Sequence, residues 1–206
     1  MYITKILNWP KQLEPKLNEV QNKNDSHDYY TKYKTDNKTG CYDLKCPGFV
    51  QTNQEISMGG ALRGSSYGAE QFIIAVKIFR ENGNGNWWLV VQNTTVGYWP
   101  SSLFKSMAKN ADYIQWGGEI YNSIPGGKHT GTEMGSGLLP ERGTQKAAYF
   151  RNCLYYDENI IGKAPDNYEI EVSKPKCYDL QYVSPVERPP GLGFFYGGAG
   201  GPNCDA

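Results

Sequence analysis

The segment that decides the fold is QFIIAVKIFRENGNGNWWLVV, residues 71–91. Apolar side chains occupy both faces of residues 71–79, a pattern typical of a strand that is covered on both sides in a packed sheet. The next residues, ENGNGN (81–86), contain Gly and Asn, which tolerate the positive φ of a tight turn. Residues 87–91 then supply a return strand, so the whole segment predicts a β-hairpin.

Shorter strands are expected on both sides of this hairpin. We predict them at residues 29–34, 49–54, 56–62, 113–116, 119–121, 146–157 and 169–172. Within this series, Gly117-Gly118 predicts a bulge or a close approach of another backbone. Residues 11–40 are otherwise polar and are expected as a linker or frayed end, and the Pro/Gly-rich tail from Pro185 is expected as coil.

One short helix is expected near residues 101–113. Pro100-Ser101-Ser102 offers its start. The apolar residues that recur there at helical spacing are Leu103, Phe104, Met107, Ala108 and Ala111. Many short strands with Gly-containing turns and a single helix predict an all-β fold, with an antiparallel β-sandwich as its architecture.

Composition excludes several classes of protein. The chain has 206 residues with 21 basic and 21 acidic side chains, whereas a dedicated binder of nucleic acid or of anionic membranes would show a basic excess. Its longest apolar run, Phe72–Val76, is too short to span a membrane. A chain of this length can fold around its own core without a metal. With only two His and no second close Cys pair beside Cys41 and Cys46, zinc is not expected, and no cofactor is predicted.

The five Cys leave at least one thiol free or paired with another chain, because their number is odd. Cys41 and Cys46 are close enough in sequence to close one turn, and Cys177 and Cys204 could close the C-terminal tail. The alternative is a set of unpaired thiols in a cytosolic protein.

Signals for secretion are mixed. Three Asn-x-Ser/Thr triplets, which begin at Asn24, Asn37 and Asn93, fit a secreted protein. The first seven residues are too short and too polar for the apolar region of a signal peptide. No signal peptide is therefore predicted in this chain.

Glu119 is the acid that stands out. It follows Trp116-Gly117-Gly118 on a predicted strand, where a carboxylate beside a Trp and bare backbone could act as a general acid or base. The alternative is a solvent-facing Glu on an edge strand. His129 lies in a Gly-rich loop and is interpreted more readily as a polar surface residue than as a base.

Aromatic residues offer a second kind of site. Trp and Tyr side chains can stack on sugars or on proline rings, or they can simply pack in the core and on the sheet surface. The residues concerned are Trp87, Trp88, Tyr98, Trp99 and Trp116.

Five motifs in sequence order resemble those of the neprosin domain family. They are TGCYDLKCPGFVQ (39–51), GNWWL (85–89), VGYWP (96–100), WGGE (116–119) and MGSG (134–137). Five motifs in the right order are far more specific than any one of them. The resemblance covers roughly residues 29–157, and the tail with Cys177 and Cys204 also fits.

The resemblance implies a fold and an activity. The family is most abundant in plants, and its fold is a glutamic-peptidase-like antiparallel β-sandwich of jelly-roll type. The implied activity is that of a secreted endopeptidase that cleaves after proline at acid pH, using two glutamates across a cleft. Its partner would be a peptide or protein substrate, including Pro-rich ones, rather than nucleic acid or a membrane.

The resemblance also assigns residues. Glu119 becomes the second catalytic glutamate, and the disulfides become Cys41–Cys46 and Cys177–Cys204, with Cys153 as an extra thiol. The candidates for the substrate cleft are Trp99, Trp116, Gln51 and His129. Such chemistry needs two carboxyls, because one must accept a proton from water while the other polarises or protonates the amide.

The sequence departs from the family at the first catalytic glutamate. That residue lies in a Glu-Ala-Gly-Trp-like motif upstream of Thr-Gly-Cys-Tyr, at a distance that falls near Pro10, and no such motif occurs there. Glu14 and Glu19 are near but in a different context. We therefore expect residues 1–28 to be a divergent or truncated, poorly ordered segment, and residues 29–206 to be an N-terminally incomplete neprosin-like domain.

Two explanations compete for this departure: a truncated product, or a shortened paralogue that has lost peptidase chemistry. In both cases we expect the chain to be inactive or very weak as a peptidase. The alternative function is a non-catalytic extracellular module that binds Pro-rich peptide or cell-wall glycan through exposed aromatics. A storage or structural extracellular protein is a third hypothesis.

Overall fold

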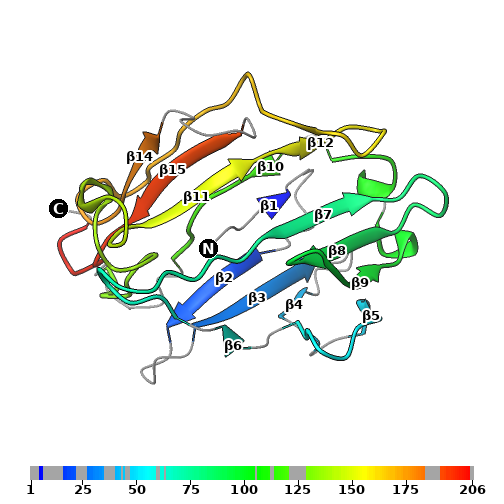
Figure 1. Ribbon diagram of the computed structural model, residues 1–206, viewed down its shortest axis with the longest axis horizontal. Helices are drawn as coiled ribbons and strands as arrows, with labels where there is room; N and C mark the ends of the chain where they lie inside the picture. Colours follow the sequence, from blue (N-terminus) through cyan, green and yellow to red (C-terminus); the bar gives the residue numbers. More distant parts are fainter. Residues whose placement is uncertain are drawn as a thin grey trace.

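The computed structural model describes residues 5–6, 16–21, 27–34, 40–42, 44, 47–58, 61–62, 64–104, 106–111, 114–120, 129–183 and 191–204. All strand pairings are antiparallel, and the all-β prediction is confirmed (Figure 1). The strands are β1 (Lys5–Ile6), β2 (Lys16–Gln21), β3 (His27–Lys34), β4 (Gly40–Tyr42), β5 (Val50–Gln51), β6 (Ala61–Leu62), β7 (Val76–Arg80), β8 (Trp87–Val91), β9 (Thr94–Trp99), β10 (Ile114–Gln115), β11 (Ala148–Cys153), β12 (Tyr155–Tyr156), β13 (Gly162–Lys163), β14 (Asp179–Val183) and β15 (Leu192–Gly197). In these ranges no helix has the length and apolar character needed to cross a membrane.

The predicted hairpin is the centre of one four-stranded sheet, with the order β5-β9-β8-β7. Strands β7 and β8 pair from Val76↔Val91 to Arg80↔Trp87, and the turn closes with Glu81 N–H donating to the Asn86 carbonyl at 2.9 Å. Burial alternates along β8, so that Trp87, Leu89 and Val91 point into the core.

The second sheet has the order β11-β15-β14. Its inner face carries a stack of aromatic rings: the Phe150 centroid lies 4.9 Å from that of Phe194 and 5.0 Å from that of Tyr196. Strand β15 is the central strand of this sheet, so the prediction of a coiled C-terminal tail is wrong. The segment has a loop-like composition because it contains Gly191, Gly193 and Gly197. It forms a strand because Phe194 and Tyr196, two residues apart, place their rings on one buried face.

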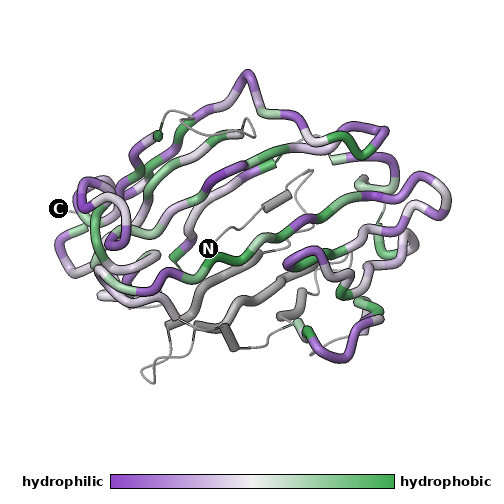
Figure 2. Tube along the Cα trace, in the orientation of Figure 1, coloured by the Kyte–Doolittle hydropathy of each residue, from purple (hydrophilic) through white to green (hydrophobic). Residues whose placement is uncertain are grey.

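Side chains from both sheets contribute to one hydrophobic core. The buried members of this cluster include Ile78, Trp87, Leu89 and Trp99 from the first sheet and Phe150, Phe194 and Tyr196 from the second. In Figure 1 the strands of both sheets run along the same diagonal, with β14, β15 and β11 above β7, β8 and β9. Figure 2 shows hydrophobic residues along β7, and hydrophilic residues at the β7–β8 turn and in the outer loop before β14.

The N-terminal segments form further pairings. Strands β2, β3 and β4 are consecutive in a sheet in which β6 also pairs with β3, and β1 pairs with β10. The predicted strand at 29–34 is confirmed as part of β3. Strand β2 was not predicted, because its sequence KLNEVQ is mostly polar.

The helix expected near residues 101–113 is replaced by two 3₁₀ turns, η1 (Ser101–Leu103) and η2 (Ser106–Ala108). Phe104 is extended between them, with φ −117° and ψ 139°. The carbonyls of Met107 and Ala108 accept hydrogen bonds from Trp87 Nε1 (3.0 Å) and Arg80 Nε (2.8 Å). These two carbonyls therefore bond to the β7–β8 hairpin, whereas an α-helix would use them for its own i→i+4 bonds.

Other strand predictions differ in extent. Strand β9 was missed, and residues 169–172 and 119–120 are not strands. The predicted strands at 49–54, 56–62 and 71–79 are shorter than expected and begin later, at Val50, Ala61 and Val76. The predicted strand at 146–157 is divided into β11 and β12, after a register shift between Phe150 and Cys153.

Candidate functional site

Glu119 lies where the chain leaves β10, and its side chain is exposed. Two glycines precede it. A Cβ on Gly117 would meet nothing within 4 Å, whereas a Cβ on Gly118 would come within 2.7 Å of Met134 Sδ and 3.1 Å of Tyr196 Cε2. The two glycines predicted a close approach of another backbone, whereas the atoms that lie against Gly118 belong to the side chains of Met134 and Tyr196. This contact fixes the backbone directly before Glu119 against the loop that carries Met134.

Trp116 anchors the other end of the same short segment. Its ring is half-buried and packs against the core, and its buried Nε1 has no hydrogen-bond partner in the described part of the chain. Glu119 is thus presented to solvent by a segment whose preceding residues are held against the sandwich.

Gln51 and Trp99 lie on the inner face of the first sheet. Gln51 pairs with Gly97 across β5 and β9, so Trp99, two residues further along β9, is its diagonal neighbour on the same face. The Gln51 amide nitrogen donates to the Asn53 carbonyl at 2.8 Å. The buried Gln51 Oε1 and Trp99 Nε1 both lack a partner among the described residues.

The aromatic residues are divided between the two faces of this sheet. Trp99 is only 3% exposed and meets Phe49 edge-on at 4.7 Å, and Trp87 is equally deep in the core. Trp88 and Tyr98 lie on the opposite face with ring centroids 4.7 Å apart. Trp88 Nε1 donates to Glu81 Oε2 at 3.0 Å. Because of this division, the five aromatics do not form one groove.

His129 is buried, so its interpretation as a surface residue is wrong. It is 7% exposed, its Nδ1 lies 3.0 Å from the Thr130 carbonyl, and its ring centroid lies 5.5 Å from that of Tyr178. The Tyr178 hydroxyl donates to the Thr132 carbonyl at 2.8 Å. His129 is therefore packed into the loop that precedes Met134.

Three cysteines have the bonding state that the family resemblance implies. The Cys177–Cys204 disulfide is present, and Cys153 is a free thiol. Burial raises the pKa of the Cys153 thiol to about 12, which makes it an inert core residue. The Cys41–Cys46 pair lies outside the described side chains.

Glu133 was missed by the sequence reasoning. It precedes Met134, and its carboxylate lies against Gly137, where a Cβ would come within 2.7 Å of Glu133 Cδ. The side chain of Met134 covers Gly118. Glu119 follows Gly118 in the sequence, and Glu133 precedes Met134. The MGSG motif was the available signal, but it did not single out the preceding acid. Among the described residues, no cluster of His, Cys, Asp or Glu is arranged to hold a metal.

These features define an all-β sandwich domain with an exposed glutamate on a Trp-Gly-Gly-Glu segment. A family model described as Neprosin matches residues 12–199. The chain belongs to the neprosin family. The match begins at residue 12, ahead of the domain boundary expected at residue 29, and therefore includes β2.

Proposed function

We propose that this chain is a peptide-acting domain of the glutamic endopeptidase type, in which Glu119 is one acid of the catalytic pair. The observation that carries the proposal is the exposed Glu119 carboxylate at the end of a segment fixed by the Gly118–Met134 contact. Family membership supports it. We also propose an extracellular location, because disulfides such as Cys177–Cys204 persist in oxidising compartments.

A single carboxylate is not enough for this chemistry. Two acids in proximity share a proton, so that one can accept a proton from water while the other protonates the amide. Residues 1–38 contain only Glu14 and Glu19 as glutamates, and neither lies in a Glu-Ala-Gly-Trp-like sequence. Glu133 precedes Met134, whose side chain lies against Gly118, the residue before Glu119. We therefore expect weak cleavage after proline at acid pH, with Glu133 as the first acid to test as the partner.

The test is digestion of a proline-containing peptide library at pH about 3 to 5, where one acid of a coupled pair stays protonated. Wild type is compared with Glu119→Gln, Glu133→Gln and the control Glu141→Gln, whose residue lies in the turn η3 (Pro140–Arg142). Cleavage that is lost in Glu119→Gln and kept in Glu141→Gln supports the proposal. No cleavage by folded wild-type protein, or equal cleavage by Glu119→Gln, contradicts it and favours a non-catalytic peptide-binding module.

A further inference from the structure

Strand β7 has an open edge. It is the last strand of its sheet and pairs only with β8 in the described part of the chain. The Ala75 carbonyl accepts from Gln92 N–H, and Glu81 N–H donates to the Asn86 carbonyl, both at 2.9 Å. Hydrogen-bonded pairs alternate along an antiparallel ladder, so the odd-numbered residues from 75 to 81 bond to β8.

The backbone groups of Val76, Ile78 and Arg80 consequently point away from β8. Among the described residues, no strand or loop accepts or donates a hydrogen bond along this edge. Unpaired N–H and C=O groups that recur every second residue are matched in spacing by another extended chain.

A pocket of about 190 Å³ lies beside this edge. Its apolar lining comes from three elements: Ile78 of β7, Ile114 of β10 and the segment Leu154–Tyr156, which includes β12. Asn82, Lys109 and Glu158 also line it and supply polar groups. The space would accommodate one apolar side chain of a strand that pairs with β7.

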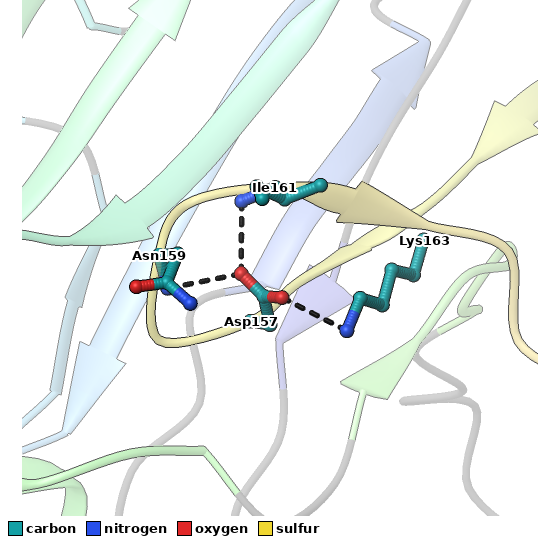
Figure 3. Close-up of polar contacts among 4 residues, drawn as sticks. All are labelled: Asp157, Asn159, Ile161 and Lys163. Atoms are coloured by element: carbon teal, nitrogen blue, oxygen red, sulfur yellow. Dashed lines mark hydrogen bonds and ion pairs between the residues drawn. The ribbon is translucent and has the colours of Figure 1, made fainter.

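Two contacts hold β7 and the β12–β13 hairpin around this pocket. Lys77 Nζ lies 4.3 Å from the centre of the Tyr156 ring, and Asn82 Nδ2 donates to the Glu158 carbonyl at 2.6 Å. Figure 3 shows the contacts that fix the loop between β12 and β13, which lines the pocket. Asp157 Oδ1 accepts from the N–H groups of Asn159 and Ile161, and Oδ2 pairs with Lys163 at 2.9 Å.

We propose that the edge of β7 binds an extended peptide from another chain, which adds a strand to the sheet and places an apolar side chain in the pocket. The outward N–H and C=O groups of β7 favour an extended peptide, because an added strand forms hydrogen bonds with such groups. The adjacent pocket would then determine which side chains of the peptide are preferred. This binding site is independent of the proposed role of Glu119.

The first test uses wild-type protein and the blocked peptide acetyl-Lys-Leu-Thr-Leu-Thr-Leu-Lys-amide, with affinity measured by calorimetry. Two further peptides carry N-methyl groups at either the odd or the even inner positions. One set of N–H groups must face β7 and the other must face away, so we expect one methylated peptide to bind more than tenfold more weakly and the other to bind like the parent. Equal binding by all three peptides, or no binding of the parent at millimolar concentration, overturns the proposal.

The second test changes the protein. Val76→Pro removes an outward N–H without removing a bond to β8, and Ala111→Leu fills the pocket, which Ala111 also lines. Both variants should bind the parent peptide at least tenfold more weakly, whereas Val50→Thr on β5, at the opposite edge, should leave the affinity unchanged. Unchanged affinity in folded Ala111→Leu overturns the assignment of the pocket, and a loss in Val50→Thr overturns the assignment of the edge.

Discussion

At the scale of single residues, two buried tryptophans with different hydrogen bonding offer a matched comparison. Trp87 and Trp99 are cross-strand partners in β8 and β9, and both are almost fully buried. Trp87 Nε1 donates to the Met107 carbonyl at 3.0 Å, whereas Trp99 Nε1 has no partner among the described residues. Removing a donor costs most where it leaves a buried acceptor unpaired.

We therefore expect Trp87→Phe to lower the free energy of unfolding by about 1 to 3 kcal/mol more than Trp99→Phe does. Both changes remove the same atoms, so the difference between them isolates the hydrogen bond. Urea unfolding with linear extrapolation measures it. Equal losses would mean that the Trp99 N–H makes a bond of similar value.

At the scale of elements, the loop between β12 and β13 is organised by Asp157. A hydrogen bond from Lys163, followed by the N–H group of Ile161, holds the pKa of the Asp157 carboxyl below its ordinary value. A carboxyl with a lowered pKa stabilises the folded loop at pH above its unfolded pKa of about 3.9, and this contribution is lost as the pH falls through the lower folded pKa.

Amide exchange at Asn159 and Ile161 should therefore accelerate, relative to the intrinsic rate, as the pH is lowered below about 4. Asp157→Asn keeps an oxygen that can accept from both N–H groups but has no carboxyl that titrates. In this variant the Asn159 and Ile161 amides should be less protected from exchange, and their protection should not depend on pH in this range. Asp157→Ala should abolish the protection at every pH. A wild-type profile that is flat between pH about 2 and 6 would contradict this account.

The elements that were predicted correctly are those whose local signals agree with their tertiary environment. The β7–β8 hairpin combines apolar strands with a Gly/Asn turn, and both signals hold. Strand β9 was missed because Gly97 interrupts it, yet a Cβ there would lie 2.2 Å from the Val50 carbonyl oxygen, so glycine is what allows β5 to pair. The expected helix does not form, although the periodic apolar residues after Pro100 do pack on the core. Side chains of β7 and β8 donate hydrogen bonds to two backbone carbonyls of this segment, which a helix would use for its own bonds.

At the scale of the whole molecule, the motifs located Glu119, but the surroundings of the candidate site depend on contacts between distant segments. The two glycines predicted a close approach of backbone, but the approach at Gly118 is made by the side chains of Met134 and Tyr196, which were not predicted. The burial of His129 depends on Tyr178, which lies beside the C-terminal disulfide. No local pattern encodes such contacts.

These contacts connect the disulfide to the candidate site. Cys177 precedes β14 and Cys204 follows β15, so the Cys177–Cys204 bond closes the end of this strand pair. Between β15 and Cys204, Gly201 N–H donates to the Thr130 carbonyl at 2.9 Å, and the Gly198 carbonyl accepts from Met134 N–H at 2.8 Å. The tail that the disulfide holds therefore positions the loop that covers Gly118.

We expect the double variant Cys177→Ser, Cys204→Ser to lose about 3 to 4 kcal/mol of unfolding free energy, as the chain-entropy model gives for a sequence separation of 27. Thermal unfolding measures this loss, and Cys153→Ala is the control that removes a thiol but no cross-link. Any peptide cleavage that depends on Glu119 should also fall in the double variant, at temperatures where it remains folded, because Met134 is then held less firmly. An unchanged unfolding midpoint would show that the hydrogen bonds of the tail hold it without the disulfide, and unchanged cleavage would separate the tail from the site.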